Sequence, residues 1–400
     1  MSFFKIYSLL KKLQTSIKCG ISRKHFSVAE NTLFFDISGI AMYDRRTGIQ
    51  RVVRELLTYL NERGFKDIKL VPVYAPRFTK GFYCIELKTD SSHKIIDINL
   101  TTERISPKAG DSLFIMDWAL GEHLCQINVL RDYKRLGVRL FYVIHDLLPL
   151  ERPDCFNNRT VYLFRRLFER LWGLTDFVCF SIVTQKKLER LKETHHFNSK
   201  IYKIRLGTWT QPNNFIEKEL PESLRREEPD QCIFLMVGTI EPRKNQQYVL
   251  REFERLWEKG SKDRLIIIGK PGWKCKEIIR ELTLKSASLK HFYYFPSISD
   301  QSLVNYYSMS SALVYASTDE GYGLPLIEAA AIGIPLICCE KPIFREILDE
   351  NAFFYSLGIG NLERAVEEWR KLPRDKIPDS RKVALYSWED MAKDLLALVL

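Results

Sequence analysis

The chain has 400 residues, of which 46% are hydrophobic, and a formal net charge of +11. This length suggests two or three domains rather than one small core. The nine cysteines show neither C-x-x-C pairs nor zinc-type spacing, which argues against a disulfide framework or a metal site and favours a reducing cytosol. No apolar run free of charges and prolines reaches about 18 residues, so no membrane-spanning helix is predicted. The positive charge indicates a polyanionic partner, either nucleic acid or the headgroups of a membrane.

The first 29 residues carry six lysines or arginines and no acidic residue. Apolar residues recur among them at helical spacing: Phe3, Ile6, Leu10, Leu13 and Ile17. This pattern is typical of a basic amphipathic helix on an anionic bilayer. The alternative is an ordinary helix that packs on the following domain.

The next segment predicts the start of a doubly wound α/β domain. Residues Asn31–Ser38 form a candidate buried strand, and Thr47 is placed to cap a helix that ends at Gly64. Gly48 and Arg51 lie at the start of that helix, where they can meet a bound phosphate or an acceptor. A solvated helix start is the alternative.

Further strands are predicted at Ser112–Met116, Arg139–Ile144 and Phe177–Phe180. Polar residues follow the first two, namely Asp117, Trp118, His145 and Asp146. Ligands of open parallel sheets bind beyond the carboxyl ends of the strands, so these side chains are expected to face a crevice. The segment Val161–Trp172 mixes aromatic residues with arginines, which suits either a membrane face or a solvated helix side.

A second series of strands and helices follows a proline-rich, charged stretch at residues 211–231 that is typical of a linker. The strand Cys232–Val237 leads into G-T-I-E-P-R-K-N and a helix over Gln246–Glu258. This turn is not a phosphate-binding P-loop, because position 243 is arginine where that motif needs glycine. The strand Leu265–Ile268 then delivers Gly269 and Lys270 to the same crevice.

The most informative stretch runs from Ser317 to Pro335, with Glu320 and Glu328 eight positions apart. A buried strand at Ala312–Ala316 precedes it, and a helix with Pro325 at its first position follows. Glycines and a helix start present backbone N–H groups that can bind an anionic group, whereas carboxylates can accept hydrogen bonds from sugar hydroxyls. A sugar nucleotide contains both kinds of group, so it would fit this stretch. Two glutamates alone are also compatible with an ordinary strand-turn-helix corner.

The string E-G-Y-G-L-P-L-I-E followed by A-A-A-x-G-x-P resembles the E-x7-E signature of glycosyltransferase family 4, whose members are retaining enzymes of GT-B fold. The resemblance implies two doubly wound Rossmann-like domains that face a central cleft. It also implies catalytic roles for Glu320, His145 in H-D-L-L-P, Arg243 and Lys244, with the last two as a diphosphate clamp. The donor-binding residues that it implies are Glu328, Gly321, Tyr322, Gly323, Leu324, Gly238, Thr239, Lys270 and Gly48. Thr239 stands where many members carry a basic residue.

Arg51, Asp117 and Trp118 are the candidates for acceptor binding. The expected organisation is an amphipathic segment at 1–29, an acceptor-side domain at 30–210, a linker at 211–231, a nucleotide-sugar domain at 232–385 and a returning helix at 386–400. No D-x-D triplet occurs, so no metal and no cofactor are expected.

The expected function is retaining transfer of a hexosyl unit, with mannose favoured, from a GDP- or UDP-linked sugar to a growing glycan such as lipopolysaccharide or capsule. The acceptor is expected to be a glycan or a lipid-linked glycan, met at the cytoplasmic face of the membrane. Two alternatives remain open: a nucleotide-sugar hydrolase or epimerase, and a basic nucleic-acid-binding protein. The second leaves the glutamate pair without a role, so nucleic acid is not the expected partner.

Overall fold

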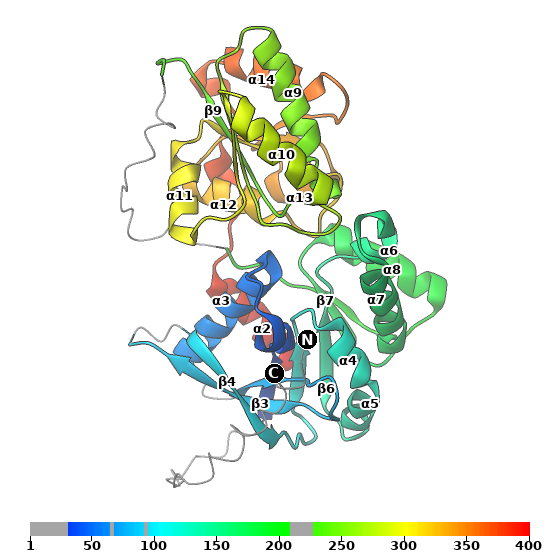
Figure 1. Ribbon diagram of the computed structural model, residues 1–400. Coiled ribbons are helices and arrows are strands. Elements are labelled where there is room, and N and C mark those ends of the chain that lie inside the picture. The colour runs from blue at the N-terminus through cyan, green and yellow to red at the C-terminus, as the bar shows by residue number, and fades with distance from the viewer. Residues whose placement is uncertain (1–30, 65–67, 92–94, 209–226) are drawn as a thin grey trace, which may run out of the picture.

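The computed structural model describes residues 31–64, 68–91, 95–208 and 227–400, which form two α/β units, each built on its own sheet (Figure 1). The expectations for residues 1–29 and for most of the linker at 211–231 lie outside these residues. The strand order of the first sheet is β4-β3-β2-β1-β5-β6-β7-β8, and that of the second is β11-β10-β9-β12-β13-β14. Both sheets are doubly wound, as predicted.

The first sheet has a parallel centre formed by buried apolar runs. Its parallel strands are β1 (Asn31–Asp36), β2 (Ile68–Tyr74), β5 (Ser112–Ile115), β6 (Arg139–Val143), β7 (Asp176–Cys179) and β8 (Ile201–Lys203). Two strands at one edge, β3 (Tyr83–Thr89) and β4 (Ile95–Arg104), are antiparallel. Sequence analysis did not predict β3 or β4, because these strands interleave exposed polar residues with buried ones and so lack a continuous apolar run. It also did not predict β2, whose apolar run contains Pro72.

The helices of this domain are α2 (Ser38–Tyr43), α3 (Gly48–Arg63), α4 (Leu120–Cys125), α5 (Ile127–Arg135), α6 (Leu148–Glu151), α7 (Asn158–Leu171) and α8 (Ile182–His195), with a 3-10 turn at Pro153–Cys155. The strand predicted to reach Ser38 ends at Asp36, because the Asp36 carboxylate accepts from the Ser38 hydroxyl at 2.5 Å and the chain turns into α2. Helix α3 begins and ends as predicted: Thr47 caps it in a capping box with Gln50, and Gly64 follows it.

Helix α7 corrects one interpretation of the sequence. Phe164 and Phe168 are buried in the core of the domain, and Trp172 packs against that core, so these aromatic residues do not belong to an exposed membrane face. The arginines of this helix, Arg159, Arg165, Arg166 and Arg170, are exposed on the other side.

The second sheet is parallel throughout and almost wholly buried. Its strands are β9 (Ile233–Val237), β10 (Arg264–Ile268), β11 (Phe292–Phe295), β12 (Ala312–Tyr315), β13 (Leu336–Cys339) and β14 (Phe353–Tyr355). The helices around it are α9 (Gln246–Glu258), α10 (Lys276–Ser288), α11 (Asp300–Met309), α12 (Leu324–Ile332), α13 (Pro342–Leu348) and α14 (Asn361–Lys371). Short 3-10 turns occur at Pro242–Lys244, Arg374–Lys376 and Ser380–Lys382.

The last helix, α15 (Trp388–Val399), returns to the first domain and lies beside α3 (Figure 1). Its buried residues, Met391, Ala392, Leu395 and Val399, belong to the same apolar cluster as the inner face of α3. The chain therefore passes between the two sheets twice. The two passages meet where Thr208 donates its N–H to the carbonyl of Tyr386 at 2.8 Å.

Candidate active site

The loop between β12 and α12 brings the two glutamates of the E-x7-E string to the carboxyl edge of the second sheet. Gly323, with φ of 110°, is the residue before α12, and this left-handed conformation favours glycine. Pro325 is the second residue of α12, not the first as predicted. Glu328 is the fifth residue, so it lies in the second turn of the helix. Glu320 lies on the loop, as predicted.

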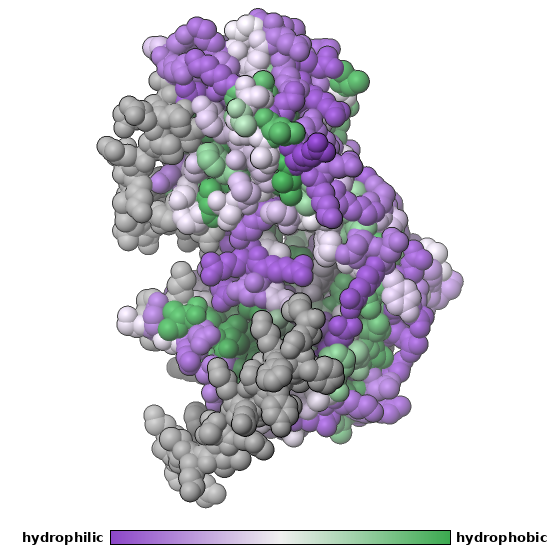
Figure 2. Space-filling model, in the orientation of Figure 1, coloured by the Kyte–Doolittle hydropathy of each residue, from purple (hydrophilic) through white to green (hydrophobic). Residues whose placement is uncertain are grey.

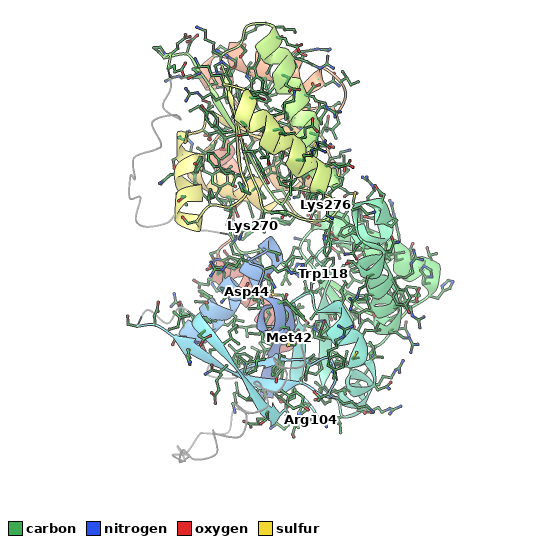
Figure 3. The ribbon with its side chains drawn as sticks, viewed as in Figure 1. Met42, Asp44, Arg104, Trp118, Lys270 and Lys276 are labelled. Carbon is green, nitrogen blue, oxygen red and sulfur yellow. The ribbon has the colours of Figure 1, made fainter. Side chains whose placement is uncertain are left out.

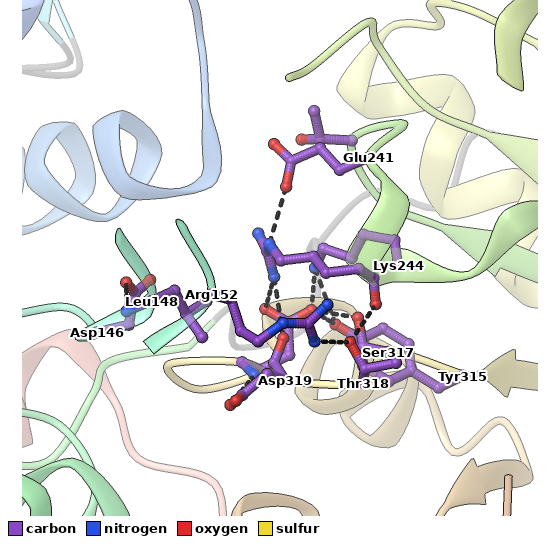
Figure 4. Close-up of polar contacts among 12 residues, drawn as sticks. Asp146, Leu148, Arg152, Glu241, Lys244, Tyr315, Ser317, Thr318 and Asp319 are labelled. Carbon is purple, nitrogen blue, oxygen red and sulfur yellow. Dashed lines mark hydrogen bonds and ion pairs between the residues drawn. The ribbon is translucent and has the colours of Figure 1, made fainter. Parts of the chain in front are cut away.

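Glu320 is the centre of a buried polar cluster, and Figure 4 labels its partners Lys244, Tyr315 and Ser317. Its Oε2 accepts from the Arg243 guanidinium at 2.8 Å. Its Oε1 accepts from the hydroxyls of Tyr315 at 2.9 Å and Ser317 at 2.6 Å, and also from the Lys244 ammonium. Both carboxylate oxygens are therefore engaged by side chains of the same domain.

The charges of this cluster balance one another. Arg243 also pairs with Glu241 at 2.9 Å, so two cations meet two carboxylates. Burial alone would raise the pKa of Glu320, but the charges of Arg243 and Lys244 outweigh burial and lower that pKa to about 2. Burial lowers the pKa of Lys244, even though Glu320 opposes this shift. Glu320 is therefore ionised at neutral pH and holds both cations at the edge of the sheet.

Glu328 lies in a separate contact that joins the two domains. Its side chain is buried, and Oε2 accepts from the Tyr307 hydroxyl of α11 at 2.9 Å. The guanidinium of Arg51, which comes from α3 of the first domain, forms an ion pair with Oε1. Gly48 lies on the same helix, and a Cβ there would come within 2.9 Å of Leu324. The start of α3 thus faces the start of α12.

His145 follows β6 of the first domain and is buried. Its Nε2 lies 2.7 Å from the carbonyl oxygen of Met116, which can only accept, so Nε2 carries a proton. Burial lowers the pKa of His145 to about 4, although the contact with Met116 opposes this shift. The ring is neutral at pH 7, with the lone pair on Nδ1.

Gly321 brings the loop of Glu320 against His145. A Cβ on Gly321 would collide with the carbonyl oxygen of His145, so only glycine permits this approach. The same Cβ would lie 3.0 Å from the Cβ of Asp146. Burial raises the pKa of Asp146 to about 6, and Arg243 partly offsets that effect. The structure therefore gathers His145, Asp146 and Glu320 from two domains.

The predicted donor-binding loops after β9 and β10 are joined to each other. Ile240 donates its N–H to the carbonyl of Lys270 at 2.8 Å, and Gly238 donates to Ile268 at 3.0 Å. The Lys270 side chain is exposed, and Figure 3 labels it at the edge of the second domain that faces the first. Thr239 is partly buried, and its carbonyl accepts from Gln246 at 2.9 Å.

Tyr322 and Leu324 take a different position from the one expected for donor contacts. Both side chains pack against the apolar cluster of the first domain. Burial raises the pKa of Tyr322, which stays neutral at physiological pH. In this arrangement the two side chains join the domains.

Two predicted acceptor residues have structural roles instead. Asp117 is buried, and its two oxygens accept from the N–H groups of Ile40 at 2.5 Å and Trp118 at 2.8 Å, so it anchors α2. Burial raises the pKa of Asp117 to about 6, although these N–H groups oppose the shift. Trp118 packs edge-on against Phe164, with ring centroids 5.5 Å apart. Both residues follow β5 as predicted, but the Asp117 side chain is buried against α2 and does not face a crevice.

Sequence analysis missed several members of the site. Tyr315, Ser317 and Glu241 surround the Glu320 cluster, and Tyr307 holds Glu328. Ser317 could have been found, since it comes three residues before Glu320 on the same loop. Tyr307 could not, because its position on a helix gives no sign of its distant partner. Within the described ranges, no group of three or more His, Cys, Asp or Glu side chains is placed to hold a metal ion.

Comparisons with known proteins show which proteins this chain is similar to. The family described as "Glycosyl transferases group 1" matches residues 217–383. The serotype-specific mannosyltransferase WbdA of Escherichia coli is 29% identical over 418 residues, which cover 98% of this chain and 48% of WbdA. The chain thus spans about half the length of that relative. The O-antigen chain mannosyltransferase B of Escherichia coli is 30% identical over 324 residues, which cover 76% of this chain and 81% of that protein.

Among solved structures, the catalytic domain of starch synthase IV from Arabidopsis thaliana superposes with a TM-score of 0.63 at 12% identity, over 92% of this chain and 98% of that one. At that identity the likeness shows the fold, which is GT-B, as the resemblance in the sequence implied. The match to mannosyltransferase B shows the family. The chain belongs to the group 1 glycosyl transferases.

Proposed function

We propose that this protein transfers a mannosyl unit from a nucleotide sugar, GDP-mannose in the first instance, to a growing O-antigen-type glycan, with retention of configuration. The observation that carries the proposal is the buried Arg243–Lys244–Glu320 cluster beside His145. The two most similar relatives described above bear names that specify mannosyl transfer, which favours mannose over other hexoses.

The proposed chemistry depends on two cations that would bind the diphosphate of the donor. Arg243 and Lys244 lie where the diphosphate of a donor would sit, at the carboxyl ends of the strands and near the start of α12. Glu328 would accept from the ribose hydroxyls, once Arg51 has moved away. The bond between the sugar C1 and the phosphate oxygen breaks, and its electron pair stays on the phosphate, where the two cations stabilise it.

The acceptor hydroxyl then bonds to C1 on the face from which the phosphate leaves, and its proton passes to a departing phosphate oxygen. His145 is neutral, so its Nδ1 can accept a hydrogen bond from a sugar hydroxyl. Glu320 is occupied by its own cations and hydroxyls, which favours a role in positioning Arg243 and Lys244 over direct contact with the sugar ring.

This mechanism assigns to two side-chain cations the role that a metal plays in some other transferases. Transfer should therefore continue in EDTA, and product formation from radiolabelled GDP-mannose with and without EDTA tests this. Activity lost in EDTA and restored by manganese would refute the metal-free mechanism.

We further propose that the enzyme works at the cytoplasmic surface of a membrane. None of the helices in the described ranges is long and apolar enough to cross one. Exposed arginines line the outer side of α7, and on the face shown in Figure 2 hydrophilic side chains predominate. Each cation near an anionic leaflet contributes about 1 kcal/mol at most, less as salt rises.

Vesicle binding tests the membrane proposal. A protein without residues 1–24 should co-sediment more weakly than the full chain with phosphatidylserine vesicles at low salt. Equal co-sedimentation would contradict the assignment of residues 1–29 as the anchor.

The decisive test of the activity compares GDP-mannose, UDP-glucose and dTDP-glucose as donors with an O-antigen oligosaccharide as acceptor. Elongation of the acceptor by one mannose supports the proposal. Free mannose without elongation would indicate a hydrolase, an isomerised nucleotide sugar an epimerase, and salt-dependent binding of oligonucleotides without donor binding a nucleic-acid-binding protein.

A further inference from the structure

A single carboxylate of the second domain holds the start of a helix in the first. Glu346, on α13, accepts the backbone N–H of Ile182 at 2.6 Å and that of Val183 at 2.9 Å. These are the first two residues of α8. Ser181 caps the same helix end by accepting the N–H of Thr184 at 3.1 Å. The first three N–H groups of α8 are thus satisfied, two of them by the other domain.

Apolar packing supports this contact. Val183 packs against the apolar cluster of the second domain, although it belongs to a helix of the first. Tyr322 and Leu324 pack in the opposite direction, against the cluster of the first domain. Each domain therefore contributes side chains that pack against the apolar core of the other domain.

The same helix end touches the catalytic loop. The Ser181 hydroxyl donates to the carbonyl of Gly321 at 3.3 Å, and Ser181 is fully buried. Gly321 lies next to Glu320 and packs on the carbonyl of His145. Glu346 and Ser181 thus fix the start of α8 relative to the loop on which the donor site is built.

Apart from the Arg51–Glu328 ion pair, two further polar contacts between the domains are weaker. Lys187 approaches Asp319 at 3.7 Å, and Arg152 donates to the Thr318 hydroxyl at 3.2 Å. These are long, partly exposed side chains, whose pairs are usually weak. Glu346 differs because the two oxygens of one side chain meet two backbone donors at a helix N-terminus, where the helix dipole adds to the attraction.

We propose that Glu346 is a positioning residue for glycosyl transfer: by binding the first turn of α8 it holds the first domain closed against the second, with His145 and the Glu320 loop facing one substrate. Glu346 touches no reacting atom. The proposal rests on the proposed transferase function, and it assigns closure to this contact rather than to the exposed ion pairs around it.

The experiment compares Glu346→Gln and Glu346→Ala with a matched control, Glu350→Gln. Glu350 is a nearby carboxylate that pairs with Arg345 at 3.1 Å, and its side chain is 83% exposed. Three quantities are measured: the dissociation constant for GDP, kcat for transfer from GDP-mannose, and the radius of gyration by small-angle X-ray scattering.

Glu346→Ala should lower kcat about tenfold to a hundredfold, since misplacement by about 1 Å has effects of this size. The dissociation constant for GDP should not rise by more than about twofold, because the Arg243, Lys244 and Glu328 side chains all belong to the second domain. The radius of gyration should rise. Glu346→Gln, which keeps one acceptor oxygen and the side-chain volume, should lie between Glu346→Ala and the native protein, and Glu350→Gln should match the native protein.

A radius of gyration for Glu346→Ala equal to the native value would overturn the proposal, as would an unchanged kcat. Failure of the proposed function would show itself differently: the native protein itself would transfer no mannose. In that case scattering alone still decides whether Glu346 holds the domains together, since it needs no substrate.

Discussion

Replacement of Glu320 by glutamine offers a direct measure of how strongly the buried cluster depends on its carboxylate. The substitution keeps the volume but removes one negative charge from a site where Arg243 and Lys244 are buried. In the native protein the pKa of Glu320 falls from 4.5 to about 2, because Arg243 and Lys244 outweigh the effect of burial. A pKa that is lowered by folding stabilises the protein above the unfolded value and ceases to do so as pH falls through the folded value.

The linkage relation turns this shift into a free energy of about 3.4 kcal/mol at pH 7, falling to about 2 kcal/mol at pH 3.5. Removal of one partner of a buried ion pair usually costs about 3–5 kcal/mol, which agrees with the first figure. Glu320→Gln should therefore lower the free energy of unfolding by about 3 kcal/mol at pH 7 and by less at pH 3.5.

Urea denaturation followed by circular dichroism at pH 7, 5 and 3.5 provides the measurement, with Glu350→Gln as an exposed control. If the free energy of unfolding falls by the same amount at all three pH values, the carboxylate contributes through its packing and not through its charge. A loss below about 1 kcal/mol at pH 7, the scale of an exposed pair, would refute the assignment of a tightly coupled buried cluster.

Arg243→Ala and Lys244→Ala should each cost about 2–4 kcal/mol in transition-state stabilisation, measured as the fall in kcat/KM, and a fall under threefold would remove either residue from the diphosphate site. Glu328→Ala should weaken GDP binding in calorimetry. Arg51→Ala should strengthen GDP binding about fivefold, because the Arg51 guanidinium occupies the carboxylate that the ribose needs. Weaker GDP binding by Arg51→Ala would instead show that Arg51 contacts the donor. Asp146→Asn should raise the free energy of unfolding by about 3 kcal/mol at pH 8, since burial raises the pKa of Asp146 and folding then opposes its ionisation. This gain should vanish about one pH unit below the unfolded pKa of 3.8, where the carboxyl is protonated in both states. Urea denaturation at both pH values checks that sign.

The parts of the fold that could be predicted from the sequence are those in which local chemistry and tertiary structure agree. The central strands are continuous apolar runs, and α3 carries its own capping box and terminal glycine, so neither needed a distant partner to be recognised. The antiparallel strands β3 and β4 could not be predicted in this way, because one side of each faces solvent and their polar residues break the apolar pattern.

The site shows the same limit. The E-x7-E string located Glu320 and Glu328, since both lie within one loop and one helix. Asp117 was assigned to the acceptor because it follows a strand, yet the N–H of Ile40, distant in sequence, occupies it. Sequence analysis also gave no sign that Arg51 would meet Glu328, or that Glu346 would cap α8, because each contact joins different domains.

The return of α15 to the first domain has a consequence for motion. The chain crosses between the domains at Thr208 and again at Tyr386, and the two crossings are hydrogen-bonded to each other. Two tethers at one place act as a single pivot: they permit the domains to rotate but resist sliding or separation. We therefore expect a substrate to enter by rotation of one domain about this pivot, and the two facing surfaces to meet again in the same register when the domains close.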